Sequence, residues 1–417
     1  MNGSGNEVIH GPDSANSWIY SLLLTAALFG FPIVSAVPVV LQSDSRSFSI
    51  AYRALVVLLS LWCVWQSLRS NRPFIGRVIR WPLAGFVIML GLRLFWDSDV
   101  KPLPLDIPWG DFWQQIIGIT LIPALPFLVV PEQSWLIRCH RISLWAALLC
   151  AISIIIGVIF SVKTLLAGGS NGRLMTDVLN SISLGAAGTS IYVIASTYRV
   201  KRGFIERIVK ALCLMLGPLL CLMSGSKTPI LALCLLILIQ YLFPAKAVSS
   251  RTRLMQALLI LAVLIGLFLF SDNTDFDLFS RFKSVGTDQS TMLRIAAWNG
   301  AMTQFNHAPF FGDAAFESTL RTYPHNIFAD ALMTTGLVGF SMFLFVLIVS
   351  MISVFKLLRT PHVRWLSLVF IQTLLGAQTS GSLYFDGVFW VMVLAMIAAG
   401  SRPANGLAHE SSALAAA

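Results

Sequence analysis

The sequence predicts an all-α, polytopic integral membrane protein with about twelve membrane-spanning helices. Hydrophobic residues make up 56% of the chain, charged residues only 12%, and the mean hydropathy is +0.78. A soluble globular domain carries about 25% charged residues. A spanning helix needs about 20 mostly apolar residues, and the chain offers such runs repeatedly. These observations exclude both a soluble protein and a protein with a single anchor.

The apolar runs divide the chain into five parts. The predicted spans are 18–41, 50–68, 79–96, 111–131, 143–163, 181–197, 205–223, 227–244, 254–271, 327–355, 364–382 and 384–400. We expect a mobile N-terminus at 1–17, membrane helices in 18–271, one long helical loop at 272–326, further helices in 327–400 and a tail at 401–417.

Lysine and arginine residues predict the orientation. Alternate loops differ about twofold in basic residues, and the richer set is expected on the cytoplasmic side. This puts both termini in the cytoplasm and the 272–326 loop outside. The net charge of +10 is spread between apolar runs, so nucleic acid is not an expected partner, whereas membrane lipids are. Cysteine is missing from the outer loop, so neither a disulfide framework nor a cysteine metal site is predicted.

His325 is the central candidate for chemistry. It lies where the long hydrophilic loop meets the apolar run that begins at Ile327, and Asn326 follows it. A histidine with a pKa near 6.5 is the usual general base at neutral pH. His307, the other outer histidine, lies in a helix-ending stretch and is expected to be a surface residue.

Four basic residues are candidates for binding an anion. Lys227 follows the short turn that contains Ser226, just ahead of a helix N-terminus, where anions bind readily. Arg173 ends a glycine-rich outer loop. Arg294 precedes Trp298 by one turn of a predicted helix at 290–306, whose apolar face holds Ile295, Trp298, Met302 and Phe305. Arg93 lies inside a predicted span, where a charge is costly. Headgroup anchoring remains the alternative for Lys227 and Arg93.

This combination suits one type of reaction. A phosphate-linked leaving group needs its charge neutralised, which arginine and lysine supply. An attacking hydroxyl needs a base, which histidine supplies. The acidic turn at Asp272, Asp275 and Asp277 lacks the spacing of a calcium loop, so no metal and no cofactor is predicted.

Several motifs resemble the O-antigen ligase family, within the wider O-antigen polymerase/ligase superfamily. They are Ser224-Gly-Ser-Lys227, Met292-Leu-Arg294-x-x-x-Trp298, Pro309-x-x-Gly312, His325-Asn-x-Phe-x-Asp-x-Leu332 and Gly336-x-x-Gly339. Three positions depart from the family pattern: Lys227 replaces a commoner arginine, Pro324 a small residue, and Asp313 interrupts a glycine pair.

The resemblance implies a GT-C-like glycosyltransferase of the bacterial inner membrane with a periplasmic active site. It would transfer a glycan from undecaprenyl pyrophosphate to the lipid A–core oligosaccharide, without a metal and with inversion, completing lipopolysaccharide. His325 would activate the acceptor hydroxyl, and Arg294 and Lys227 would hold the pyrophosphate. An O-antigen polymerase using the same donor is the first alternative. A polytopic lipid or sugar transporter is the second, and a protein O-oligosaccharyltransferase is less favoured.

Overall fold

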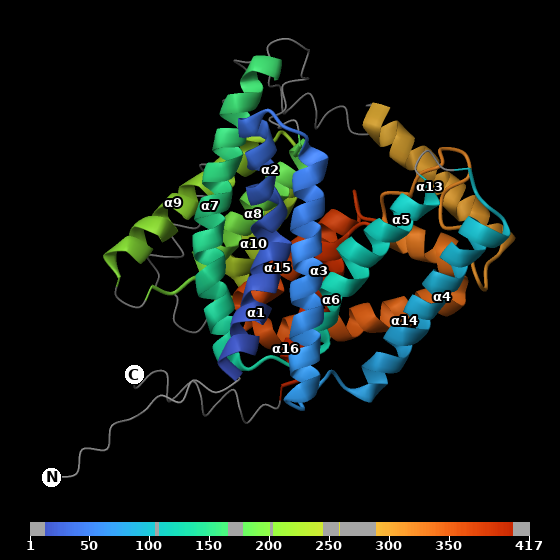
Figure 1. The fold of residues 1–417 in the computed structure, drawn as a ribbon, viewed down its shortest axis with the longest axis horizontal. Helices are drawn as coiled ribbons and strands as arrows, with labels where there is room; N and C mark the ends of the chain where they lie inside the picture. Colours follow the sequence, from blue (N-terminus) through green and yellow to red (C-terminus); the bar gives the residue numbers. More distant parts are fainter. Residues whose placement is uncertain are drawn as a thin grey trace.

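The computed structural model describes residues 13–104, 108–165, 178–200, 203–244, 258 and 289–402. Within these ranges the regular structure is helical, apart from an isolated antiparallel bridge between Phe74 and Val129. The all-α prediction is therefore confirmed for the described part of the chain (Figure 1).

The helices follow one another along the chain with short connections. The α-helices are α1 (Asp13–Thr25), α2 (Phe31–Leu41), α3 (Ser45–Arg69), α4 (Arg77–Phe95), α5 (Trp109–Gln115), α6 (Ile122–Ala124), α7 (Gln133–Leu165), α8 (Ser181–Thr197), α9 (Phe204–Met223), α10 (Lys227–Leu242), α13 (Gln289–His307), α14 (Ile327–Leu358), α15 (Arg364–Ala377) and α16 (Gly387–Gly400). Short π-helical or 3-10 segments are η1 (Ala26–Gly30), η2 (Trp96–Val100), η3 (Ile116–Leu121) and η4 (Leu125–Leu128).

Several of these helices are long and apolar enough to cross a membrane. By length and composition, the described residues contain 5 candidate spans, at Asn16–Leu41, Ser45–Arg69, Arg77–Val100, Gln133–Ser161 and Ile327–Leu358. Helices α10, α15 and α16 are shorter and also apolar. A multi-pass helical membrane protein is thus supported, while the count of about twelve spans stays a prediction. The predicted span at 254–271 lies outside the described residues, except for position 258.

The predicted span at 111–131 is not one regular helix. It divides into α5, η3, α6 and η4. Pro123 and Pro126 fall in this stretch and supply no amide donor to a helical ladder, which favours breaks in the helix.

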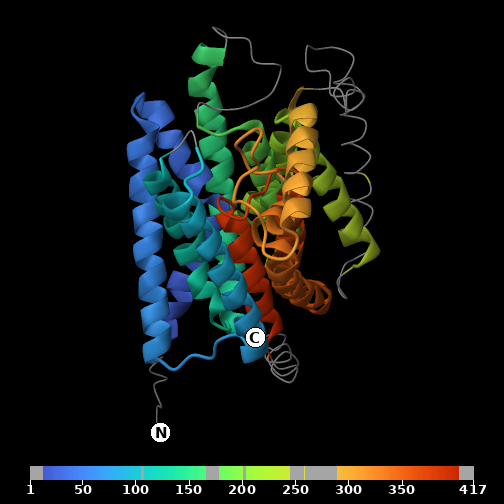
Figure 2. The same cartoon turned by 90° about the vertical axis from the view of Figure 1, so that its right-hand side faces the viewer.

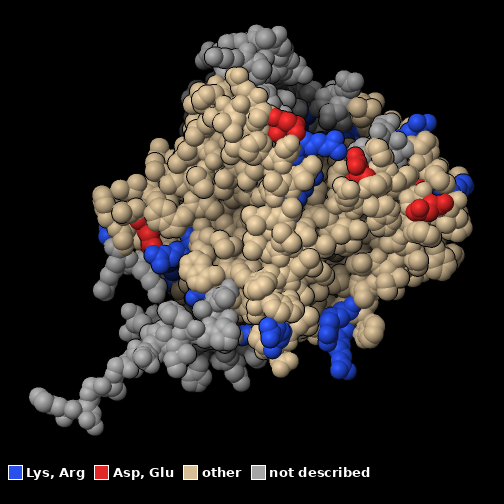
Figure 3. Space-filling view, in the orientation of Figure 1, with Lys and Arg blue, Asp and Glu red and all other residues tan. Residues whose placement is uncertain are grey.

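Helices α3 and α4 present apolar side chains outward. Leu58 on α3 is 65% exposed, and Trp81 and Leu92 on α4 are 73% and 63% exposed. Figure 3 shows a broad uncharged surface with charged side chains mainly near its upper margin and toward its lower edge. Such a surface suits the hydrocarbon core of a bilayer.

Loops predicted to be cytoplasmic gather at one end of the bundle. Arg72, after α3, donates to Glu132, before α7, at 2.5 Å. Arg138 on α7 donates to Ser17 on α1. The antiparallel pair α4 and α14, which meet at Phe86 and Phe343, brings the end of α14 to the same level (Figures 1 and 2). Which side of the membrane this end faces stays a prediction.

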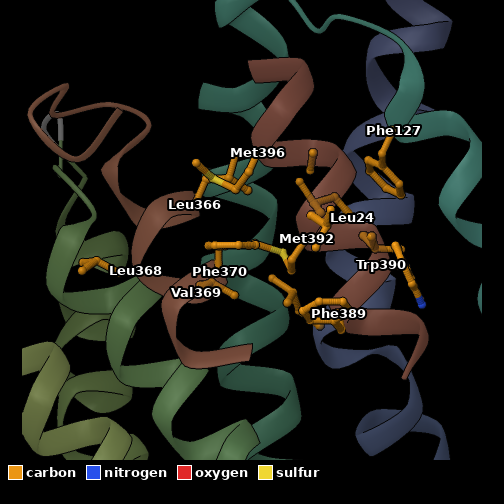
Figure 4. Close-up of a cluster of buried hydrophobic side chains, with 14 of the residues drawn as sticks. Leu24, Phe127, Leu366, Leu368, Val369, Phe370, Phe389, Trp390, Met392 and Met396 are labelled. Atoms are coloured by element: carbon orange, nitrogen blue, oxygen red, sulfur yellow. The ribbon is translucent and has the colours of Figure 1, made fainter. Parts of the chain in front are cut away.

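The core is built around α15 and α16. Every residue of α16 from Phe389 to Ala399 is buried, and Figure 4 shows Phe389, Met392 and Met396 with Leu366 and Phe370 of α15 in one apolar cluster. Such a helix, apolar on all sides, is stable only when other helices surround it.

Close packing between α8 and α9 is also seen. A Cβ atom at Gly188 would lie 2.7 Å from the backbone nitrogen of Cys221 and 2.7 Å from the carbonyl oxygen of Gly217. Only glycine allows this approach. The close packing predicted for the 181–197 helix is therefore confirmed.

Helix α14 is broken at Gly336, where φ is 58° and ψ is −166°. The break frees backbone groups that the turn at 309–313 then satisfies. Leu337 N–H donates to the Pro309 carbonyl at 2.8 Å, and Asp313 N–H donates to the Met333 carbonyl at 2.9 Å. A membrane helix tolerates a break only where such partners exist.

Candidate functional site

His325 immediately precedes the N-terminus of α14 and adopts a left-handed backbone with φ 55°. Few residues other than glycine do so. Asn326 fixes the chain on one side, because its Oδ1 accepts the N–H groups of Phe328 at 3.0 Å and Ala329 at 3.2 Å. Pro324 on the other side is buried. An uncommon conformation held in this way is typical of functional sites.

Tyr323 packs against the imidazole. The two ring centroids are 4.4 Å apart with an interplanar angle of 59°. The Tyr323 ring in turn lies 6.0 Å from Phe385, in the loop at 378–386 between α15 and α16. The same loop accepts a bond from Asn326 Nδ2 to the Gln378 carbonyl at 3.2 Å. The loop therefore supports His325 through both of its neighbours.

Arg294 on α13 acts electrostatically on both rings. Partial burial lowers the pKa of His325 below its ordinary value, and the positive charge of Arg294 lowers it further. Burial raises the pKa of Tyr323, with Asp330 and Asp386 adding to the rise and Arg294 opposing it. His325 is therefore neutral at neutral pH and has a nitrogen lone pair for a proton.

A buried polar network lies beneath the histidine. Asp330 is fully buried; its Oδ2 accepts the Leu383 N–H at 2.9 Å and its Oδ1 accepts the Thr334 hydroxyl at 3.4 Å. The hydroxyl of Tyr384 donates to the Thr334 hydroxyl oxygen at 3.2 Å. The network ties the first half of α14 to the 378–386 loop. Sequence reasoning assigned no role to Tyr323, Asp330 or Tyr384, although a carboxylate inside an apolar run is an available signal.

Helix α13 confirms the predicted helix at 290–306 but packs through the face opposite to the one expected. Ala297 and Ala301 are buried, whereas Ile295, Trp298 and Met302 are exposed. Small residues allow closer approach: a Cβ at Gly300 would meet the Glu317 carboxylate. The side chain of Gln304 then bonds the Phe316 carbonyl at 3.1 Å and the Ser318 N–H at 2.9 Å.

Arg93 joins α4 to the turn that fills the break in α14. Its guanidinium donates to the carbonyl oxygens of Gly312 and Asp313, each at 2.5 Å, and lies 3.6 Å from the Asp97 carboxylate. Asp97 in turn accepts the Ala315 N–H at 2.7 Å. These bonds account for a charge inside a predicted span. A role in binding substrate stays a prediction.

Lys227 begins α10, after a buried turn. Gly225 in that turn has φ 59°, and the N–H of Ser226 donates to the Ser224 hydroxyl at 3.2 Å. The side chain of Ser226 does not cap the helix. The turn therefore depends on backbone geometry, and Lys227 is half-buried at its end.

Bonds between helices place this turn near the site. The Pro229 carbonyl accepts the Thr189 hydroxyl of α8 at 3.2 Å, and the neighbouring Ser190 bonds Gln372 of α15. Arg364, at the opposite end of α15, reaches the Gln240 carbonyl near the end of α10. Since α10 and α15 are antiparallel, Lys227 lies at the end of the bundle where α15 leads to Gln378 and Asn326.

Two predictions cannot be placed. Arg173 lies outside the described residues. Among the described residues, no group of three or more His, Cys, Asp or Glu side chains is arranged to hold a metal ion, and metal independence stays a prediction.

The fold and site define a multi-pass helical membrane protein whose candidate centre is a neutral histidine beside an arginine, at the start of a broken helix. Residues 211–344 match the family described as O-antigen ligase, so the chain carries a domain of the O-antigen ligase family and the predicted resemblance is confirmed. The match spans Ser226, Lys227, Arg294, Trp298, His325 and Asn326, whereas Arg93 and Arg173 precede it. None of the curated proteins matches the chain.

Proposed function

We propose that the protein is an O-antigen ligase, transferring glycan from undecaprenyl pyrophosphate to the lipid A–core oligosaccharide at the periplasmic face of the inner membrane. The observation that carries the proposal is the pairing of His325 with Arg294 inside the family segment. The pairing supplies a base for an acceptor hydroxyl and a positive charge for a pyrophosphate.

The proposed reaction is a single displacement at the sugar carbon that bears the pyrophosphate. The acceptor hydroxyl oxygen forms the new glycosidic bond while the bond to the pyrophosphate oxygen breaks, which inverts that carbon. The hydroxyl proton passes to His325, and the leaving oxygen keeps the bonding electron pair. Arg294 and Lys227 stabilise the negative charge that develops on the pyrophosphate.

The remaining candidates take supporting roles. Asn326 fixes the start of α14, and Ser226 belongs to the turn that presents Lys227. Trp298 is exposed beside Arg294 on α13, where it is available to the glycan. Tyr323 orients the imidazole of His325 by ring packing. Arg93 holds the turn at 309–313, and Arg173 adds a further positive charge to the donor site.

A polymerase would use the same donor and base and differs only in the acceptor. The break in α14 also supports the transporter alternative to some degree, because discontinuous helices line many transport sites. The deciding experiment therefore measures what becomes of the donor.

The test uses the purified full chain with an undecaprenyl-pyrophosphate-linked glycan, lipid A–core and EDTA. We expect glycan on lipid A, lost in H325A and retained in the matched control H307A, since His307 is exposed at the end of α13. Longer lipid-linked glycan with lipid A unchanged would establish a polymerase. An unaltered donor that crosses a vesicle membrane would establish a transporter.

A further inference from the structure

An apolar cavity of about 110 Å³ lies between α4, the η3–α6–η4 stretch and α16. Leu83, Val87 and Leu90 line it from α4, Leu121 and Leu125 from the opposite side, and Trp390 from α16. Figure 4 shows Trp390 on the side of α16 away from Leu368 and Phe370. The α16 core is therefore packed on its α15 side and leaves this space on the other.

The lining has almost no polar character. Thr120 is its one polar side chain, and the Thr120 hydroxyl already donates to the Tyr384 carbonyl at 2.5 Å. A water molecule needs two or more polar partners to remain in a cavity. Polar ligands are excluded for the same reason, so the chemistry selects hydrocarbon.

The lining also reaches the surface expected to face lipid. Leu125 belongs to the cavity wall and is 37% exposed. On α4 the lining residues alternate with Ile88 and Leu92, which are both exposed. A hydrocarbon chain could thus enter from the bilayer.

One wall of the cavity belongs to the loop that supports the candidate site. Leu383 lines the cavity, and its N–H is the group that donates to Asp330. Two residues later, Phe385 packs on Tyr323, which contacts His325. A chain in the cavity therefore lies beneath the elements that hold the histidine.

From this continuity we propose that the cavity holds part of the polyprenyl chain of the donor lipid, anchoring the carrier while its pyrophosphate lies near Arg294. This inference rests on the proposed function for the identity of the lipid. Each buried methylene or methyl group contributes about 0.8 kcal/mol, so even partial occupancy would give appreciable affinity.

The test is photocrosslinking of the full chain in phosphatidylcholine nanodiscs with a diazirine-bearing undecaprenyl phosphate, followed by mapping of the labelled peptides. We expect label on α4 and the η3–α6–η4 stretch. L90W, which fills the cavity, should reduce this label about tenfold, as expected for an overpacked site. The matched control L92W changes an exposed residue of the same helix and should keep it.

Two measures keep the test decisive. V87F fills the cavity at a half-buried position and replaces L90W if that variant does not fold. Excess phospholipid separates the sources: loss of label would mean that acyl chains are the occupant and would overturn the proposal, as would equal label in L90W and L92W. Crosslinking requires no glycan transfer, so specific label without ligation would refute the proposed function and leave the cavity site intact.

Discussion

The N–H of Leu337 donates to the carbonyl oxygen of Pro309 at 2.8 Å, across the point where α14 is broken. This bond and its neighbour from Val338 to Phe310, at 3.1 Å, continue the helical ladder through a different segment of the chain. The Pro309-x-x-Gly312 and Gly336-x-x-Gly339 motifs, which are separate in the sequence, therefore form one structural unit. That unit sets the distance between α13, which carries Arg294, and the half-helix that follows His325.

Substituting Gly336 tests this unit. G336A should destabilise the protein by about 2 to 4 kcal/mol, because the φ is positive and the added Cβ would lie 2.4 Å from the Phe310 carbonyl carbon. G376A on α15 is the control, since a Cβ there has open space and should be neutral or slightly stabilising. Thermal unfolding in detergent measures both, and equal melting temperatures would disprove the role assigned to the break.

The activity of the proposed ligase should fall at acidic pH as His325 gains a proton. Burial and Arg294 both lower the pKa of His325, so the acid limb of kcat/KM should lie below the usual histidine value of about 6.5. R294Q removes the repelling charge, and the acid limb should then move to higher pH. Since the pKa is lowered in the folded state, its contribution to stability is also lost as pH falls. An acid limb that is the same in both proteins would separate Arg294 from His325.

Tyr323 should affect turnover more than donor binding. Y323L removes the ring that packs on the imidazole and should lower kcat about 10- to 100-fold with little change in KM for the donor, as expected for a misaligned base. Y323F keeps the ring and should retain most activity. Steady-state kinetics distinguish the two variants, and equal losses would point to the hydroxyl instead of the ring.

Arg93 should matter for the geometry of the turn. R93Q removes charge-assisted bonds to the Gly312 and Asp313 carbonyls and should cost about 1.5 to 3 kcal/mol of stability. R46Q is the control, because its ion pair with Asp111 is exposed and 3.7 Å long and should contribute less than about 1 kcal/mol. If R93Q melts like the wild type and loses donor affinity alone, Arg93 binds the substrate directly.

The sequence was sufficient for the class and for much of the site. Hydropathy predicted helices in a membrane, and the position of His325 between a polar loop and an apolar run identified the centre. Its limits are physical. Helical periodicity marked Ile295, Trp298 and Met302 as the packed face of α13, but apolar character does not distinguish a packed face from an exposed one, and alanine packed instead. Partners distant in the chain, such as Leu383 for Asp330 or Gly312 for Arg93, leave no local pattern. The intramembrane charge at Arg93 was visible, and its carbonyl partners were not.

The left-handed backbone of His325 bears on how any mutagenesis at this position is interpreted. Alanine removes the imidazole and also disfavours the native φ of 55°, so an inactive H325A combines two effects. Asparagine tolerates this conformation better than most residues and glycine accepts it freely, yet neither is a useful base. A series of Asn, Gly and Ala therefore separates loss of the proton acceptor from loss of the local conformation. If all three are equally inactive, the defect is chemical; if alanine alone is inactive, it is conformational.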